Sequence, residues 1–352
     1  MPVFLYLNMK KTFQNKAKSV YGLVFLVLLL VLGFTFLVSL TVGRYGISLL
    51  DSIKILISKI YPIAQTWDST TESVIFTLRL PRTLAACVVG AALAVSGSAY
   101  QSMFKNPMVS PDILGVSSGA TVGASLAILF GLDSGWIQVF AFAGGIIAVG
   151  LTTSVPFIMR SQSIIMLVLA GIIVGGLMSS IMGIIKYVAE PTTALAQMTY
   201  WAMGSFGKIY LEDLNTVLLP ILLSIAVLYL IRFQLNVLSL GDQEAKTLGV
   251  NVGRIRAIII IAATLATASA VSLAGTIGWV GLVIPHLARI LIGSDNRITI
   301  PVTIILGSSF MILVDTLART VTTQDLPISI ITGLVGAPFF FFLLLRQRRG
   351  LQ

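Results

Sequence analysis

The sequence predicts an all-α polytopic membrane protein with about ten transmembrane helices. Hydrophobic residues make up 57% of the 352 residues and charged residues only 10%, against roughly 25% charged residues in a soluble chain. The apolar runs are continuous and about 20 residues long, whereas the strands of a membrane barrel would alternate over about 10 residues. Because unpaired backbone groups are costly in lipid, each run should form a helix.

Ten apolar runs follow one another along the chain. We expect spans at about 20–42, 82–104, 114–131, 137–159, 163–186, 214–235, 255–275, 279–293, 299–320 and 327–345. The first run is too long for the apolar part of a signal peptide and has no small-residue cleavage site, so it should be retained. The spans form one transmembrane domain over residues 20–346, between a cytoplasmic segment 1–19 and a cytoplasmic tail 347–352.

The distribution of charge predicts the orientation. If the N-terminus is cytoplasmic, most of the 23 lysines and arginines lie on the cytoplasmic side and most of the 13 acidic residues on the other. Short cytoplasmic loops carry such an excess of basic residues, so both termini should be cytoplasmic. The net charge of +10 follows from this topology and predicts a lipid membrane as partner rather than nucleic acid. Outside, residues 192–206 suit a helix at the interface.

Residues 239–256 form a polar, charged island between two spans. Its core, 243–248, favours a helix, and Gly241 and Gly249 allow sharp turns at its two ends. A solvated loop would explain the charges alone, whereas a helix with such ends suits an element presented to a partner. The chain contains no Gly-x-x-x-x-Gly-Lys-Ser/Thr phosphate loop, so any ATP would be hydrolysed by another chain.

Charged residues also occur at the ends of spans two and nine. Arg79 and Arg82 flank Leu80-Pro81 at the outer mouth of span two. They either extend along the interface or form a fork for carboxylates of a partner or substrate. Asp315 and Arg319 are four residues apart in span nine, so they can pair on one helix face. Arg319 is then either half of a structural pair or a residue of the outer surface.

The small residues of span two and the scarcity of histidine and cysteine further limit the kinds of site that the chain can form. The run from Gly90 to Gly97 in span two suits close helix packing or the lining of a pathway. The single His286 and single Cys87 allow no multi-histidine metal site and no disulfide. We expect no catalytic residue, no metal and no cofactor.

Six strings, in this order, resemble the FecCD family of ABC-importer permeases for iron chelates, haem and cobalamin. They are Arg79-Leu-Pro-Arg82, Gly90 to Gly97, Asn106-Pro107 with Pro111 and Gly115 to Gly119, Gly241 to Gly249, Gly278 to Arg289, and Pro327 to Pro338. Each string alone is weak. The ordered set covers nearly the whole of 20–346 and accompanies the ten-span count, which makes the resemblance specific.

The resemblance implies a BtuC-like type II ABC importer permease of the bacterial cytoplasmic (inner) membrane. Such a subunit has no ATPase site of its own and is not an enzyme. It pairs with a second copy or a paralogue, around a path at the two-fold interface. Two ABC ATPase subunits bind on the cytoplasmic side, and a substrate-binding protein or lipoprotein docks outside. The cargo then crosses by alternating access.

The resemblance also implies roles for particular residues. Residues 239–251 match the coupling helix region that contacts the ATPase, through Gly241, Asp242, Glu244, Ala245, Leu248 and Gly249. Arg79, Arg82 and Arg319 match arginines that dock the binding protein. Ser161, Gln162 and Ser163 match, more loosely, part of the inner gate.

The expected cargo is a ferric siderophore, with haem, cobalamin and molybdate as alternatives. A transporter driven by an ion gradient is the rival from another class. It would need intramembrane carboxylates or a proton relay, and Asp315 alone qualifies, with an arginine nearby. A channel or receptor is a third class, for which the sequence contains no filter-like segment.

Overall fold

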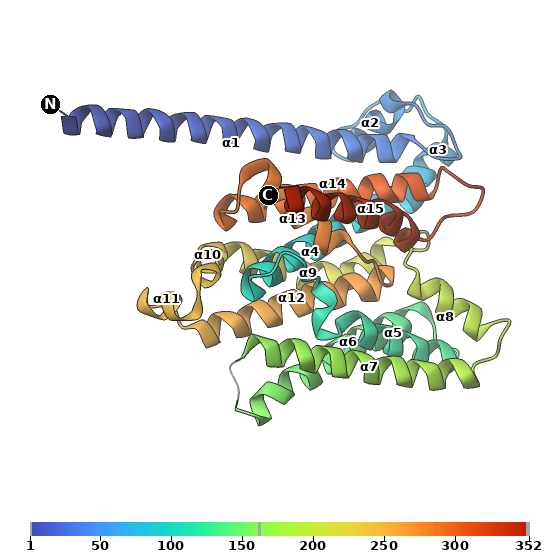
Figure 1. Ribbon diagram of the computed structural model, residues 1–352. Coiled ribbons are helices and arrows are strands. Elements are labelled where there is room, and N and C mark those ends of the chain that lie inside the picture. The colour runs from blue at the N-terminus through green and yellow to red at the C-terminus, as the bar shows by residue number, and fades with distance from the viewer. Residues whose placement is uncertain (1, 161–162, 350–352) are drawn as a thin grey trace.

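The computed structural model describes residues 2–160 and 163–349, and this part of the chain contains helices and no strands. The long helices run side by side in one bundle (Figure 1). One end of the bundle carries α10 (Arg232–Leu240) and α11 (Asp242–Thr247), and we call it the α11 end. The opposite end carries α2 (Leu49–Ser58), α3 (Ser69–Ser73) and α8 (Ala194–Ala202), and we call it the α8 end.

The ten predicted spans coincide with ten apolar helices. They are α1 (Pro2–Thr41), α4 (Leu80–Phe104), α5 (Val116–Leu129), α6 (Ser134–Ile158), α7 (Ile164–Val188), α9 (Leu211–Leu230), α12 (Val252–Ala274), α13 (Val280–Ile292), α14 (Asn296–Ala318) and α15 (Ile328–Arg349). Seven of the described helices are long and apolar enough to cross a membrane, and α5, α13 and α15 contribute shorter apolar segments. The all-helical fold class is confirmed.

Among the boundaries that differ from the sequence prediction, two have a clear local cause. Span six was expected to continue to residue 235, but α9 ends at Leu230 and α10 begins at Arg232. The Arg232 side chain donates a hydrogen bond of 2.8 Å to the Tyr229 carbonyl, so it satisfies one of the last carbonyls of α9. The break lets α10 leave the direction of α9 and lead the chain into α11.

Span two begins earlier than predicted, because helical structure continues from Ser69 to Phe104. Residues Val74–Arg79 form a π-helical turn, in which the Leu80 N–H bonds to the Ile75 carbonyl. Pro81 has no N–H and its ring clashes with the carbonyl four residues before it in a regular helix. A π-turn just before the proline relieves that clash and keeps the helix continuous.

The centre of the bundle is α4, which packs against α9, α12, α13 and α14. A Cβ placed on Gly90 would lie 2.2 Å from the carbonyl oxygen of Gly307 in α14. A Cβ on Gly97 would lie 1.8 Å from the carbonyl oxygen of Gly281 in α13. The packing interpretation of the run from Gly90 to Gly97 is therefore confirmed, because only glycine lets these backbones approach so closely.

Candidate functional site

The charged island folds as the short helix α11, which has a complete C-terminal cap. The Gly249 N–H bonds to the Lys246 carbonyl and the Val250 N–H to the Ala245 carbonyl, each at 3.0 Å. Gly249 has φ +78°. This is the Schellman arrangement, which needs a left-handed residue, and glycine takes that conformation without strain. These capping hydrogen bonds thus stabilise the C-terminal end of a helix that has only six residues.

The N-terminal side of α11 depends on Gly241. Its φ is +144°, and a Cβ there would lie 1.8 Å from the Glu244 carboxylate, which folds back over the glycine. The Gly241 carbonyl accepts the first helical hydrogen bond, from the Ala245 N–H at 2.9 Å. Glycines at the two ends therefore have the local role that the sequence predicted for them.

Two residues fasten α11 to the bundle. Ala245 is fully buried in a core cluster that includes Leu235, Leu238 and Val252. The Asp242 carboxylate accepts two hydrogen bonds of 2.8 Å from Arg256 of α12, and Lys105 at the end of α4 lies 3.6 Å from it. Asp242 therefore holds α11 against two spans.

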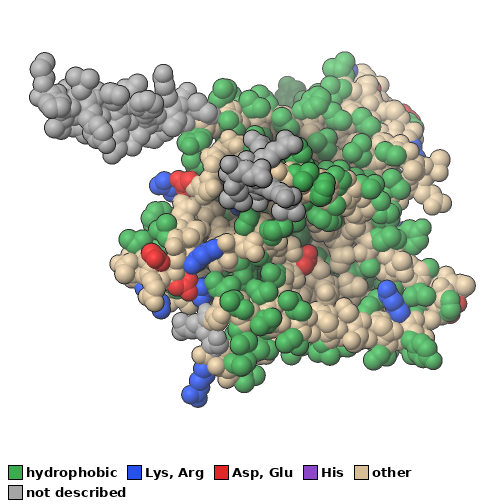
Figure 2. Space-filling view, in the orientation of Figure 1, with side chains coloured by type: hydrophobic (Ala, Val, Ile, Leu, Met, Phe, Trp, Pro, Cys, Tyr) green, Lys and Arg blue, Asp and Glu red, His purple; other side chains and the backbone are tan. Residues whose placement is uncertain are grey.

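The opposite side of α11 is open. Glu244 is exposed, Leu248 is 61% exposed, and Leu240 just before the helix is 64% exposed. Large apolar side chains beside a carboxylate, on a helix fixed from behind, form a surface suited to contact with another protein. Figure 2 shows charged side chains gathered at this end of the bundle.

Helix α10 ties the same end to α14. The Asn236 amide donates to the Asp295 carboxylate at 2.6 Å and accepts from the Asn296 N–H at 2.7 Å. The Ser102 hydroxyl of α4 donates to the Asn296 side chain at 3.2 Å. Hydrogen bonds from Arg297, and then from Asn236, hold the pKa of Asp295 at about 2. A displacement of α10 and α11 would thus reach α4, α12 and α14.

At the α8 end, Arg79 is an internal residue. It is 5% exposed, and its guanidinium donates to the carbonyls of Leu40 at 2.6 Å, Thr41 at 2.9 Å and Tyr45. Those carbonyls belong to the end of α1 and the turn after it, where helical partners have run out. Arg79 therefore caps α1 in this structure, and its side chain is not presented to a partner.

Arg82 and Arg319 also have internal partners. The Arg82 Nε lies 2.8 and 3.0 Å from the two Asp315 carboxylate oxygens, and its Nη1 lies 2.5 Å from Asp325. Arg319 lies 3.9 Å from Asp315 and donates to the carbonyl and hydroxyl of Ser39. The predicted pairing of Asp315 with Arg319 is present, but the shorter contact of Asp315 is with Arg82.

Some residues of these clusters were missed by the sequence reasoning. They are Arg44 and Asp325, which pair at 3.4 Å, and Arg256, Lys105 and Asn236 at the α11 end. Asp325 could have been singled out, because it lies two residues before Pro327, at the same side of the membrane as the few outer arginines. Arg256 lies 14 residues from Asp242 in the same charged island, whereas the partners of Arg44, Lys105 and Asn236 are far away in sequence and leave no local signal.

The predicted inner-gate residues are only partly visible. Ser161 and Gln162 lie outside the described residues. Ser163 is the residue before α7 begins, at the turn between α6 and α7, as the sequence predicted.

The bundle of ten apolar helices in the described part of the chain, with a short anchored helix exposed at one end, is that of a polytopic membrane protein. The chain matches the FecCD transport family over residues 28–346. It belongs to that family, the permease subunits of ABC importers.

Individual relatives support the assignment. The chain is 38% identical over 333 residues to the molybdate import system permease protein MolB of Haemophilus influenzae, covering 95% of this chain and 97% of that one. It is 38% identical to a probable iron chelatin transport system permease protein of Helicobacter pylori, covering 80% of this chain and 85% of that one. Among solved structures, an inward-facing conformation of a putative metal-chelate type ABC transporter superposes with a TM-score of 0.82 at 36% identity, covering 92% of this chain and 99% of that one.

Proposed function

We propose that α11 is the element through which two separate ATPase subunits drive this permease. The observation that carries the proposal is a helix of only six residues that is capped at its C-terminal end, anchored through Ala245 and Asp242, and open on its other face. Such preorganisation lowers the entropy cost of docking. The exposed Glu244 and Leu248 would make the contact.

The anchors of α11 provide the route for the motion. Asp242 connects α11 to α12 through Arg256 and to α4 through Lys105. Asn236 connects α10 to the start of α14. Closure of the ATPase dimer would push on α11, and these links would tilt the three spans against the rest of the bundle, which is alternating access.

Two substitutions distinguish binding of the ATPase subunits from transmission of their motion to the spans. Glu244→Lys should reduce co-purification of the ATPase subunits, because it reverses the exposed charge. Asp242→Ala should lower uptake much more than co-purification, because it removes the link to Arg256 but keeps the exposed Glu244 and Leu248. Asp68→Lys, at an exposed carboxylate of the α8 end, is the control for charge reversal. Normal assembly and uptake in Glu244→Lys would refute the proposed contact.

The α8 end would then face outward and receive a substrate-binding protein or lipoprotein. In this arrangement Arg82, which lies beside the partly exposed Asp325, is the docking residue among the three predicted arginines. Arg79 and Arg319 would support the surface from within. A second permease copy or a paralogue would complete the path. Arg82→Glu should weaken docking of the binding protein, and an unchanged binding constant would refute this role.

The proposed cargo is a ferric siderophore. The iron chelatin permease and the metal-chelate type transporter support a metal chelate. Molybdate is the second candidate, because the molybdate permease MolB matches 95% of the chain. Uptake of radioactive iron chelates and of molybdate, in a strain that lacks the gene and in the same strain complemented, distinguishes the two. Molybdate uptake alone would overturn the siderophore.

A further inference from the structure

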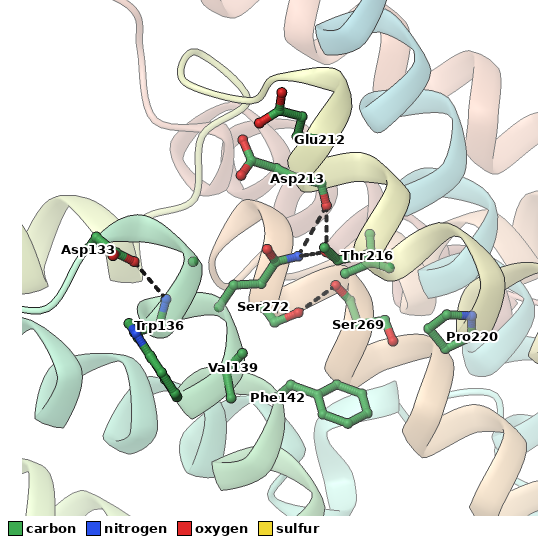
Figure 3. Close-up of a pocket in the computed structure, with 13 residues that line it drawn as sticks. Asp133, Trp136, Val139, Phe142, Glu212, Asp213, Thr216, Pro220, Ser269 and Ser272 are labelled. Atoms are coloured by element: carbon green, nitrogen blue, oxygen red, sulfur yellow. Dashed lines mark hydrogen bonds between the residues drawn. The ribbon is translucent and has the colours of Figure 1, made fainter.

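Acidic residues of the α8 end differ in the partners that they have. Beside a groove of about 570 Å³ between α6 and α9, Asp133 accepts a hydrogen bond from the Trp136 N–H at 3.1 Å (Figure 3). Asp213, on the other wall, accepts one from the Tyr210 N–H at 3.0 Å. These carboxylates cap the first turns of their own helices. Asp325 is different, because it lies between α14 and α15 and pairs with arginines from two other parts of the chain.

Asp325 bridges two arginines at the surface. Its Oδ2 lies 2.5 Å from Nη1 of Arg82 in α4, and its Oδ1 lies 3.4 Å from Nη2 of Arg44, which follows α1. The Asp325 side chain is 32% exposed, between a nearly buried Arg82 at 12% and an open Arg44 at 59%. Water and salt screen ion pairs at such positions, so each pair is weak. A charged group of a partner can therefore compete with this bridge.

Arg82 is held in place without Asp325. Its Nε lies 2.8 and 3.0 Å from the two oxygens of Asp315, which is fully buried in α14. Its Nη1 instead bonds to the partly exposed Asp325. Loss of Asp325 would thus free a donor on a guanidinium whose position is already fixed, and an arginine with a free side suits bidentate binding of another carboxylate.

The segment that carries Asp325 can move. Residues 319–327 form turns and bends between α14 and α15, and residues 320–324 are exposed. The Leu326 N–H donates to the Ala318 carbonyl at 2.9 Å and closes this loop at its base. Exposed, irregular segments open at a low free energy. The Asp325 carboxylate can therefore leave the two arginines while α14 and α15 stay in place.

The balance of charge shows what would replace Asp325. Three arginines, Arg44, Arg82 and Arg319, meet the two carboxylates of Asp315 and Asp325 in one connected cluster. Without Asp325, only the buried carboxylate would remain, and the surface would be strongly positive. Such a surface attracts an acidic side chain of a partner, since complementary charge guides docking. Asp325 occupies the position that this side chain would take.

We propose that Asp325 is an internal competitor for an acidic side chain of the substrate-binding protein. In the free permease, Asp325 neutralises Arg82 and Arg44. In the docked complex, a carboxylate of the partner replaces it and the 319–327 segment moves away. The competition lowers the affinity of docking, so the binding protein can leave after delivery. This inference rests on the proposed docking at Arg82 and adds the residue that limits its strength.

The affinity of the binding protein for the permease tests the competition. The probe is the purified substrate-binding protein from the operon of the permease, titrated against the full permease in lipid nanodiscs and followed by biolayer interferometry. Asp325→Asn should tighten the dissociation constant about fivefold, or about 1 kcal/mol, because the two arginines lose their internal partner. Glu72→Gln is the matched control. Its carboxylate is 29% exposed and pairs with Lys59 at 3.0 Å, so it should change the constant by less than about twofold.

Arg82→Gln shows whether the gain depends on the arginine. It removes the charge and should weaken binding, and adding Asp325→Asn to it should then tighten binding by less than about twofold, because the two residues act as one coupled pair. Hydrogen exchange of the unmodified permease is a second readout. Docking should speed exchange of the Leu326 amide, since the 319–327 segment is released.

The results distinguish this inference from the proposed docking itself. Unchanged affinity in Arg82→Glu would refute docking at Arg82, and the competition with it. Weaker binding in Arg82→Glu, together with unchanged or weaker binding in Asp325→Asn, would keep the docking and overturn the competition. A gain in Asp325→Asn that persists beside Arg82→Gln, or that Glu72→Gln matches, would also overturn it, because net charge would then explain the effect. Equal Leu326 exchange with and without the binding protein would do the same.

Discussion

Arginine at position 79 shows how one side chain can organise the end of a span. Its planar guanidinium reaches carbonyls of Leu40, Thr41 and Tyr45, and these groups would otherwise be left without partners where α1 ends. A lysine has one compact ammonium and cannot reproduce the fork. The same burial that makes Arg79 structural removes it from any surface contact.

Arg79→Lys should therefore destabilise the purified protein by about 2 kcal/mol or more, the scale of lost hydrogen bonds to a charged group. The measurement is the midpoint of thermal unfolding in detergent. Arg44→Lys is the matched control, because Arg44 has a side chain that is 59% exposed and should change stability by less than about 0.5 kcal/mol. Equal midpoints for Arg79→Lys and the unmodified protein would contradict the capping role.

Asp315 illustrates a limit of local reasoning at the same scale. The spacing of four residues pointed to Arg319, and that pair exists at 3.9 Å. The nearer partner, Arg82, is 233 residues away in sequence. Asp315 is fully buried and its charge is compensated by two guanidiniums, so it offers no free carboxylate for an ion-gradient transporter.

At the scale of elements, the close packing of α4 depends on glycines, which have no side chain. Its contacts with α13 and α14 occur where Gly97 meets Gly281 and Gly90 meets Gly307. In lipid there is little hydrophobic drive between helices, so close backbone packing has to supply the attraction. The short α11, in contrast, is stabilised mainly by its own turns and caps and makes few contacts with the rest of the bundle.

Gly97→Ala should push α4 away from α13, because the new Cβ would lie 1.8 Å from the Gly281 carbonyl oxygen. We expect a loss of about 1–3 kcal/mol or more, seen as a lower unfolding midpoint and a lower yield of folded protein. Gly150→Ala in α6 is the control, since no atom outside its own stretch of helix backbone lies within 4 Å of its Cβ position. An unchanged midpoint for Gly97→Ala would contradict the packing account.

At the scale of the whole molecule, orientation decides what each end can meet. The distribution of basic residues predicts that the α11 end is cytoplasmic. The structure brings α10, α11 and the start of α12 together at that end, so a partner that contacts the open side of α11 acts on a segment that is joined to α4, α12 and α14.

Cysteine labelling checks this orientation. Because Cys87 is the one cysteine of the chain, Cys87→Ala leaves a background in which single cysteines can be placed. In intact cells, Gln243→Cys on α11 should resist a membrane-impermeant maleimide, and Thr66→Cys at the α8 end should react. The reverse pattern would invert the topology and remove the α11 end from an ATPase.

The sequence by itself predicted the ten apolar helices, their approximate limits and the ends of α11. These features depend on continuous apolar runs and on glycines, which act within a few residues. Only the tertiary structure decided that Arg79 caps α1, that Arg82 pairs with Asp315 and Asp325, and that a groove separates α6 from α9. Such contacts join residues that lie far apart along the chain, and the packing of the helices alone brings them together.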